Sequence, residues 1–346
     1  MKVLVSFQPN NRKAPEFEGA RLRKTIKGAL EMAEVEYTTS IVDKYDALHL
    51  MSPEDENKLN DAKEKNVPVI VSALYAESDP YASYVEYKSK DGVRSVRLAD
   101  KALRFLNKAD LVLVPSEKSR NFLVDSGITT DISISQPGLN ISRFDFSRED
   151  EKTLFYRYFR EDSKKRLVIG IGEYDLNMDG INAFVNAAKK CPDVLFYYIG
   201  RETTPNAYNS SKVKKLISGA PKNLKFVNIV PDDIYRSALL NASVFVVPGY
   251  KPAGIMSVVD AMGAKCQIIA RKQALLNDFV EDGKTAYLGE FSETLSSLVR
   301  DYLQGKLKPT IEEAHTLVST KCNLKTVGEQ LKWFYIEQIN IKNLSR

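Results

Sequence analysis

Short apolar runs alternate with amphipathic stretches along the whole chain. In residues 1–150 the runs typical of buried strands are 2–7, 35–41, 46–50, 68–72, 111–114 and 131–135. The stretches that carry the spacing of helices are 18–33, 54–65, 95–108 and 117–126. Regular alternation of strand and helix predicts an α/β fold, with parallel sheets that helices cover on both faces.

The alternation is interrupted once and then restarts. A turn over 136–140 and a charged segment over 147–165, with one short helix near 150–160, precede the strand 167–172. Further strands are predicted near 194–199, 224–227, 243–247, 266–270 and 285–288, and helices near 179–190, 211–218, 232–241, 256–263 and 292–304. We therefore predict two Rossmann-like domains, residues 1–150 and 151–322. A last helix within 323–346 is expected to pack back toward the first domain.

Composition describes a water-soluble chain of two ordinary domains. The 346 residues are 43% hydrophobic and 27% charged, and no apolar run reaches the ~18 residues of a membrane span. The first residues read as a strand, not as a signal peptide. The three cysteines, Cys191, Cys266 and Cys322, lack disulfide or zinc spacing, so we expect buried free thiols in a reducing cytoplasm.

Positive charge is concentrated in the second half. Residues 1–150 carry 22 Lys and Arg against 24 Asp and Glu, whereas the remaining residues carry 28 against 21. Such an excess suits an anionic ligand, such as a nucleotide diphosphate, or an acidic membrane surface. A generally basic solvated face is the simpler interpretation. The interleaved basic and aromatic residues of a nucleic-acid module are missing.

Several motifs follow one another along the chain in a fixed order. They are 24–53 with "EYTT" and "YDALH", "ADLVLVPS" at 109–116, "PGLN" followed by Arg143-Phe144, Gly180 to Ala188, and 244–288. Together these segments resemble the family 4 glycosyltransferases, and 24–53 is similar to the members that extend diacylglycerol glycolipids. In 244–288, Pro248, Asp260-Ala261-Met262 and the strand 267–269 hold the family's places. The order and spacing of these segments cover nearly the whole chain.

The resemblance implies a GT-B fold, with two Rossmann-like domains whose parallel sheets face each other across a cleft. It implies retaining transfer of a hexose from a nucleotide sugar of the UDP-glucose or UDP-galactose type. The acceptor would be diacylglycerol or a glycolipid bound by the first domain. No metal or other cofactor is implied, because cationic side chains and a helix N-terminus offset the charge of the leaving diphosphate.

Site residues follow from the same resemblance. His49 matches the family's "YD..H" and is the expected catalytic residue of the first domain. Asp260 matches the second acidic position and is the expected catalytic residue of the second domain, where it would also hold the donor ribose. The remaining donor-pocket residues are expected to be Gly172, Arg201, Gly254, Ile255 and Ser257. Taken by itself, a histidine at a strand end is more often a hydrogen-bonded structural group.

Four positions depart from the family pattern. Ser72 replaces a histidine, three carboxylates and no cation occupy 173–179, Pro252 replaces the first acidic residue, and Gly249 replaces a serine. Like charges beside a diphosphate repel it, and proline offers no side-chain hydrogen bond. One alternative is therefore a catalytically degenerate homologue that acts as a partner or regulatory subunit of another glycosyltransferase. A second alternative is an exopolysaccharide glycosyltransferase.

Two basic clusters bear on location. Arg94, Arg97, Lys101, Arg104 and Lys108 have the spacing of one helical face, and Tyr81, Tyr84 and Tyr87 precede them. Arg21, Arg23, Lys24 and Lys27 form a second cluster. Basic and aromatic residues together favour contact with an anionic membrane, so we expect a cytoplasmic protein at the inner face of the cell membrane. An ordinary solvated helix face is the alternative.

Overall fold

The chain divides into two compact units. In this computed structural model, the described residues are 1–7, 17–51, 55–75, 84–88, 94–145, 149–172, 178–200, 207–248, 255–272 and 278–344. The first unit comprises Met1–Gly138, Gly254–Met256 and Lys321–Arg346, and the second comprises Leu139–Ala253 and Ser257–Thr320. The boundary expected at residue 150 thus lies at 138, and α13 (Leu324–Leu344) belongs to the first unit.

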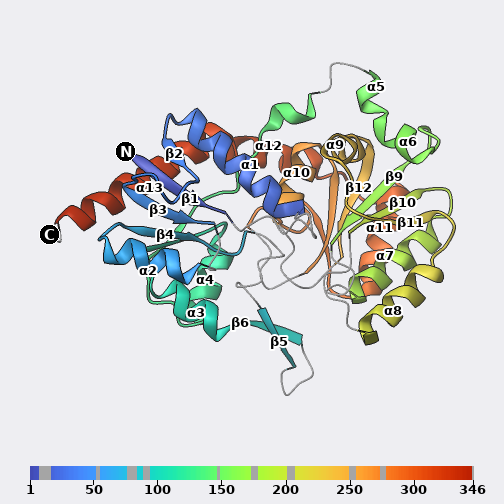
Figure 1. Cartoon of the computed structure of the whole chain (residues 1–346). Coiled ribbons are helices and arrows are strands. Elements are labelled where there is room, and N and C mark those ends of the chain that lie inside the picture. Colours follow the sequence, from blue (N-terminus) through green and yellow to red (C-terminus); the bar gives the residue numbers. More distant parts are fainter. Residues whose placement is uncertain are drawn as a thin grey trace. The chain divides into compact units, whose positions relative to one another are not determined.

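The first unit is built on a six-stranded parallel sheet (Figure 1). In spatial order its strands are β2 (Glu36–Thr38), β1 (Lys2–Ser6), β3 (Ala47–Leu50), β4 (Val69–Ser72), β7 (Leu111–Val114) and β8 (Ile132–Ile134). All pairings between these strands are parallel. Five strands lie within one residue of the predicted ranges, and β2 ends three residues earlier than predicted. The central strands β3, β4 and β7 are buried at every position, which is why their apolar runs identify them.

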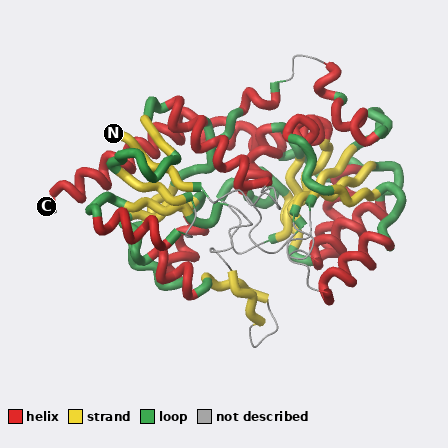
Figure 2. The backbone as a smooth tube through the Cα atoms, in the orientation of Figure 1, coloured by secondary structure: helices red, strands yellow, loops and turns green. Residues whose placement is uncertain are grey.

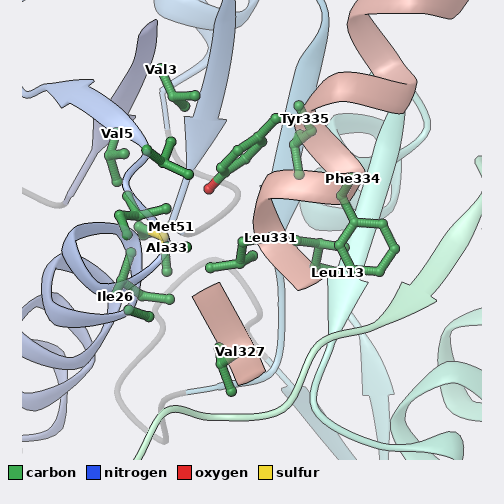
Figure 3. Packing of buried hydrophobic residues seen from close by; sticks show 14 of the residues in the cluster. Val3, Val5, Ile26, Ala33, Met51, Leu113, Val327, Leu331, Phe334 and Tyr335 are labelled. Atoms are coloured by element: carbon green, nitrogen blue, oxygen red, sulfur yellow. The ribbon is translucent and has the colours of Figure 1, made fainter. Parts of the chain in front are cut away.

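Two layers of helices cover this sheet. One face carries α1 (Phe17–Met32) and α13, and the other carries α2 (Glu56–Glu64), α3 (Asp100–Leu106) and α4 (Glu117–Asp125). Alternate strand residues serve the two cores: Val3 and Val5 face α1 and α13, whereas Leu4 faces the other layer. Figure 3 shows Val327, Leu331, Phe334 and Tyr335 of α13 packing into the first of these cores.

The predicted helix over 95–108 is wrong in its first part. Residues Arg94–Leu98 form strand β6, which pairs antiparallel with β5 (Tyr84–Lys88), and the helix α3 begins only at Asp100. The basic residues predicted for a single helical face are therefore divided between a strand and a helix. The second predicted cluster is also not one surface, because Arg21 is buried and Arg23 stacks over Phe7.

The second unit repeats the design with a different strand order. Its parallel sheet contains, in spatial order, β11 (Leu224–Val227), β10 (Leu195–Ile199), β9 (Leu167–Ile171), β12 (Ala242–Val247), β13 (Gln267–Arg271) and β14 (Tyr287–Gly289). Figure 2 shows this sheet as one layer of strands flanked by helices. One face is packed by α7 (Met178–Lys190) and α11 (Ser292–Leu303). The other helices are η1 (Ile141–Phe144), α5 (Glu149–Lys152), α6 (Leu154–Phe159), α8 (Ala207–Ser218), α9 (Asp232–Asn241), α10 (Ile255–Gly263) and α12 (Ile311–Lys321).

The three cysteines are buried free thiols, as predicted. Burial raises the pKa of the thiols of Cys266 and Cys322, which makes them poor nucleophiles.

Candidate functional site

The strand order of the second unit marks a ligand-binding position. In the order β11-β10-β9-β12-β13-β14, the strands β10 and β11 follow on one side of β9, and the strands from β12 onward follow on its other side. The sheet therefore changes its direction of winding between β9 and β12. Open α/β sheets bind ligands in the crevice outside the carboxyl ends of the strands at this switch point. Gly172 follows β9, and Pro248 followed by the segment leading to α10 follows β12. Gly172, Gly254, Ile255, Ser257 and Asp260 of the predicted donor set come from these two connections and from α10, whereas Arg201 follows β10.

Gly172 occupies a conformation that only glycine adopts readily. Its φ is +150°, and its N–H donates to the carbonyl oxygen of Ile199 at 3.2 Å. Two residues earlier, Gly170 makes room for the core, because a Cβ there would lie 2.8 Å from Phe184 and 3.1 Å from Tyr198. At the end of β9, Gly172 is thus the residue whose backbone conformation favours glycine.

Helix α10 begins directly after the β12 connection. Ile255 is its first residue, and Ser257, in its first turn, is buried. The partial positive charge at a helix N-terminus favours the phosphate groups of a ligand. Four predicted or discussed positions, Arg201, Gly249, Pro252 and Gly254, lie outside the described residues, as does the acidic segment 173–177.

Asp260 lies in a buried ion pair with Arg143. Its two carboxylate oxygens are 3.1 and 3.0 Å from Nη1 of Arg143, and the side chains of the two residues are 3% and 11% exposed. Nη2 of Arg143 donates to Asp232 at 2.5 Å, and Arg236 donates to the backbone carbonyl of Arg143 at 2.9 Å. These contacts connect η1, α9 and α10 through one guanidinium group.

Arg143 is the residue that sequence reasoning missed. In the sequence Arg143 belongs to a family motif, and Asp260 lies 117 residues further along the chain. One signal existed: Asp260 is the single charged residue of an otherwise apolar helix, IMSVVDAMG, and a buried carboxylate requires a partner. The sequence gives no indication of which cation supplies it. Gly263, the last residue of α10, lets this helix pack closely against η1 and the residues before it. A Cβ at Gly263 would lie 3.0 Å from Leu139 and 3.3 Å from Phe144.

His49, the expected catalytic residue, is enclosed within the first unit. The side chain is completely buried, with Nδ1 2.7 Å from the Tyr335 hydroxyl and Nε2 2.8 Å from Oγ of Ser72. Burial lowers the pKa of His49 to about 3, so the imidazole is neutral at physiological pH. Both ring nitrogens are already hydrogen-bonded. This geometry supports the structural interpretation of His49, and the catalytic role stays a prediction.

Ser72 and the residues that follow β4 form the corresponding edge of the first unit. Ser72 stands where the resemblance implies a histidine, and it bonds His49 instead. Leu74 has a φ of +67°, which is rare for a branched side chain and indicates backbone strain. The hydroxyl of the buried Tyr75 donates to the carbonyl oxygen of Ser135 at 2.5 Å. Strain at the carboxyl end of a central strand marks this loop as a candidate part of an acceptor site.

No metal centre is evident among the residues that the structure describes. They contain no group of three or more histidine, cysteine, aspartate or glutamate side chains placed to hold an ion.

Comparison with known proteins gives the family context. Residues 165–304 match the family model described as "Glycosyl transferases group 1". A processive diacylglycerol alpha-glucosyltransferase of Acholeplasma laidlawii is 24% identical over 318 residues, covering 91% of this chain and 92% of the relative. An alpha-monoglucosyldiacylglycerol synthase of the same organism is 24% identical over 324 residues, covering 87% and 77%. The predicted resemblance to glycolipid glycosyltransferases is thereby confirmed.

Solved structures confirm the predicted GT-B fold. Anabaena HepE in complex with UDP and glucose has a TM-score of 0.73 at 14% identity, covering 97% of this chain and 100% of that one. Sucrose-phosphate synthase from Thermosynechococcus elongatus has a TM-score of 0.73 at 15% identity, covering 99% and 100%.

Proposed function

We propose that this chain, a GT-B glycosyltransferase homologue whose residues 165–304 form a group 1 glycosyltransferase domain, transfers a hexose from a UDP-sugar to a diacylglycerol or glycolipid acceptor with retention. The observation that carries the proposal is the switch point between β9 and β12 inside that domain. The donor class is supported by similar structures solved with UDP and with UDP-glucose. The acceptor class is supported by the two relatives named for diacylglycerol.

The donor would lie with its diphosphate at the N-terminus of α10. Bond cleavage transfers negative charge to that diphosphate, and the helix dipole with its free N–H groups stabilises the charge as it develops. Gly172 leaves the backbone open on the β9 side, and Ser257 offers a hydroxyl in the first turn. Arg201, which follows β10, is the proposed cation. The mechanism requires no metal ion.

Asp260 is proposed to accept hydrogen bonds from the donor ribose while it remains paired with Arg143. A carboxylate offers about four lone-pair positions, and the contacts to Arg143 come from the single donor Nη1. Arg143 would then hold the carboxylate in one orientation, so that ribose meets a fixed acceptor.

Titration calorimetry with UDP, UDP-glucose and UDP-galactose tests the donor half of the proposal. We expect binding, and Asp260→Asn, which keeps the side-chain volume, should weaken it about tenfold because a charged acceptor is lost. Glu312→Ala, in the exposed ion pair with Lys265, is the matched control and should bind normally. Absence of binding at about 1 mM nucleotide would exclude a UDP-sugar donor.

A second function is favoured by the state of His49 and Ser72. His49 is buried with both ring nitrogens hydrogen-bonded, so neither nitrogen is directed at a substrate, and Ser72 stands where the resemblance implies a second histidine. The chain would then be a catalytically degenerate homologue that binds a partner glycosyltransferase. Nucleotide binding without product formation from a diacylglycerol or glycolipid acceptor would support this second function over the first.

Large apolar side chains on the exposed side of α13 support a membrane-bound acceptor. Trp333, Ile336, Ile341 and Leu344 are 56%, 44%, 52% and 88% exposed, whereas the opposite face of the helix is buried in the core. The same exposed side also carries Glu329 and Glu337. Within the described part of the chain, no helix combines the length and apolarity needed to cross a membrane. Aromatic and aliphatic side chains among polar ones fit peripheral contact with the lipid headgroups. We propose that α13 lies on the inner face of the cell membrane.

Sedimentation with liposomes tests this contact. The double variant Trp333→Asp/Ile336→Asp should lower the bound fraction about tenfold, because two exposed apolar side chains that would contact the lipid are replaced by charges. Thr326→Asp/Glu329→Asp, on exposed positions of the same helix, is the control and should bind as the parent does. Equal binding of the apolar-face variant and the parent would remove α13 from the proposed contact. A strong decrease with salt would point to the exposed Lys101, Arg104 and Lys108.

A further inference from the structure

The second unit contains a pocket at the edge of its sheet opposite the switch point. The pocket has a volume of about 420 Å³. Its walls come from the turns that precede three neighbouring strands: Glu161 and Lys165 before β9, Pro192–Val194 before β10, and Pro221–Asn223 before β11. In a parallel sheet, the amino ends of the strands lie at the edge away from the carboxyl ends. The pocket is therefore separate from the proposed donor site.

Hydrogen bonds hold the walls of this pocket in place. Nδ2 of Asn223 lies within hydrogen-bond distance of the carbonyl oxygens of Ala188, Cys191 and Val194, at 3.1, 2.9 and 2.9 Å. The α7–β10 and α8–β11 turns are thus tied to each other. Two prolines, Pro192 and Pro221, further restrict these turns. A pocket with fixed walls binds a ligand at a lower entropic cost than one that must form on binding.

The charges around the pocket divide into a compensated pair and two remaining cations. Oε1 of Glu161 accepts from the hydroxyl of Tyr197 at 2.6 Å and from Nζ of Lys225 at 2.5 Å, which holds the pKa of Glu161 below its usual value. Two more cations line the pocket: Lys165 and Lys222 are exposed, and the charge of Lys165 also lies near enough to Glu161 to lower the pKa of its carboxyl. Asp193 adds one exposed carboxylate at the same pocket.

We propose that this pocket is an accessory binding site for a small phosphorylated polyol. Lys165 and Lys222 contact the phosphoryl group as charge-assisted donors. Asp193 accepts hydrogen bonds from hydroxyl groups of the polyol, and the neutralised Glu161–Lys225 pair leaves the local charge positive. The volume is large enough for a phosphate ester of a sugar or of glycerol, and lies in the range of small-ligand sites. The ligand is either a free phosphate ester or the headgroup of a phospholipid.

Titration of the full chain with glycerol 3-phosphate, and with glycerol as the uncharged reference, tests the site. We expect glycerol 3-phosphate to bind and glycerol not to bind. The double variant Lys165→Ala/Lys222→Ala should weaken binding about tenfold, since two charge-assisted contacts are lost. The control Lys164→Ala/Lys189→Ala removes two exposed lysines that do not line the pocket, and should bind as the parent does. All four side chains are exposed, so the fold is preserved in both variants.

Two further arms separate this site from the proposed donor site and identify the source of the phosphate. Saturating UDP should leave the affinity for glycerol 3-phosphate unchanged; competition between them would overturn the proposal. Vesicles of phosphatidylcholine with and without phosphatidic acid test the headgroup source, which is supported if the lysine double variant loses binding to the acidic vesicles only. If neither probe binds, or if both lysine variants bind alike, no such site exists. The titration with glycerol 3-phosphate does not depend on UDP binding, so its result remains valid even if the proposed donor is wrong.

Discussion

Replacing Gly328 with alanine is expected to destabilise the first unit by about 3 kcal/mol or more, because the added methyl group has no space. A Cβ at this position would lie 2.0 Å from the carbonyl oxygen of Ala29 and 2.9 Å from Cβ of Ala33. The nearest neighbour is backbone, so α1 and α13 must move apart. Alanine's better helix propensity, about 1 kcal/mol, is too small to offset the clash.

Gly28→Ala is the matched control for Gly328→Ala. It lies on α1, and its added Cβ would meet only the flexible end of Leu324, at 3.2 Å. We expect no loss of stability, or a gain of up to about 1 kcal/mol.

Urea unfolding followed by tryptophan fluorescence measures both variants. Trp333 is the only tryptophan and lies on α13, so its signal reports on the contact in question. A Gly328→Ala variant as stable as the parent would show that the two helices do not approach this closely.

Replacing Arg143 with methionine is the second change with a large expected effect. The carboxylate of Asp260 is 3% exposed, so losing its guanidinium partner leaves a poorly solvated charge, at an expected cost of about 3–4 kcal/mol. Asp232 loses a partner as well, but it is 49% exposed and water can solvate it. The loss should therefore arise mainly from Asp260.

Lys265→Met is the control, because it breaks an ion pair that is exposed to solvent instead of buried. Lys265 and Glu312 are 50% and 72% exposed, and breaking such a pair should cost less than about 1 kcal/mol. The double variant Arg143→Met/Asp260→Leu should regain at least about 1 kcal/mol relative to Arg143→Met, because it removes the uncompensated charge.

Urea unfolding followed by circular dichroism measures these free energies, and hydrogen exchange localises them. Faster exchange in peptides from η1 and α10 is expected for Arg143→Met. Equal stability of Arg143→Met and Lys265→Met would mean that the pair does not hold η1 to α10.

Much of the fold was predictable because its signals are local. The strands of both sheets were found from runs such as 111–114 and 167–171, since a strand buried on both faces must be apolar at every position. The helix α12 was missed. Thr310, three residues before Glu313, has the pattern of a helix cap and was a usable signal, although in the structure its hydroxyl accepts from Gln267.

Errors in the prediction share one physical cause, namely pairing between distant residues. The spacing of Arg94 and Arg97 fits a helix, yet antiparallel pairing with β5 makes this segment a strand. The partners of His49 are equally distant, since a hydroxyl 286 residues away on α13 bonds its ring. Periodicity within a segment carries no information on such partners.

The sequence by itself determined the two Rossmann-like sheets, the GT-B resemblance and the positions at which a donor site should lie. The sheets follow from short apolar runs and the resemblance follows from the order of motifs, and both can be recognised within short segments of the sequence. Only the tertiary structure decided that Asp260 is paired with Arg143, that His49 is neutral and enclosed, and that Gly328 must lack a side chain. Each depends on atoms that are far apart in sequence and within a few ångströms after folding, where burial makes an unpaired charge or a surplus methyl group costly.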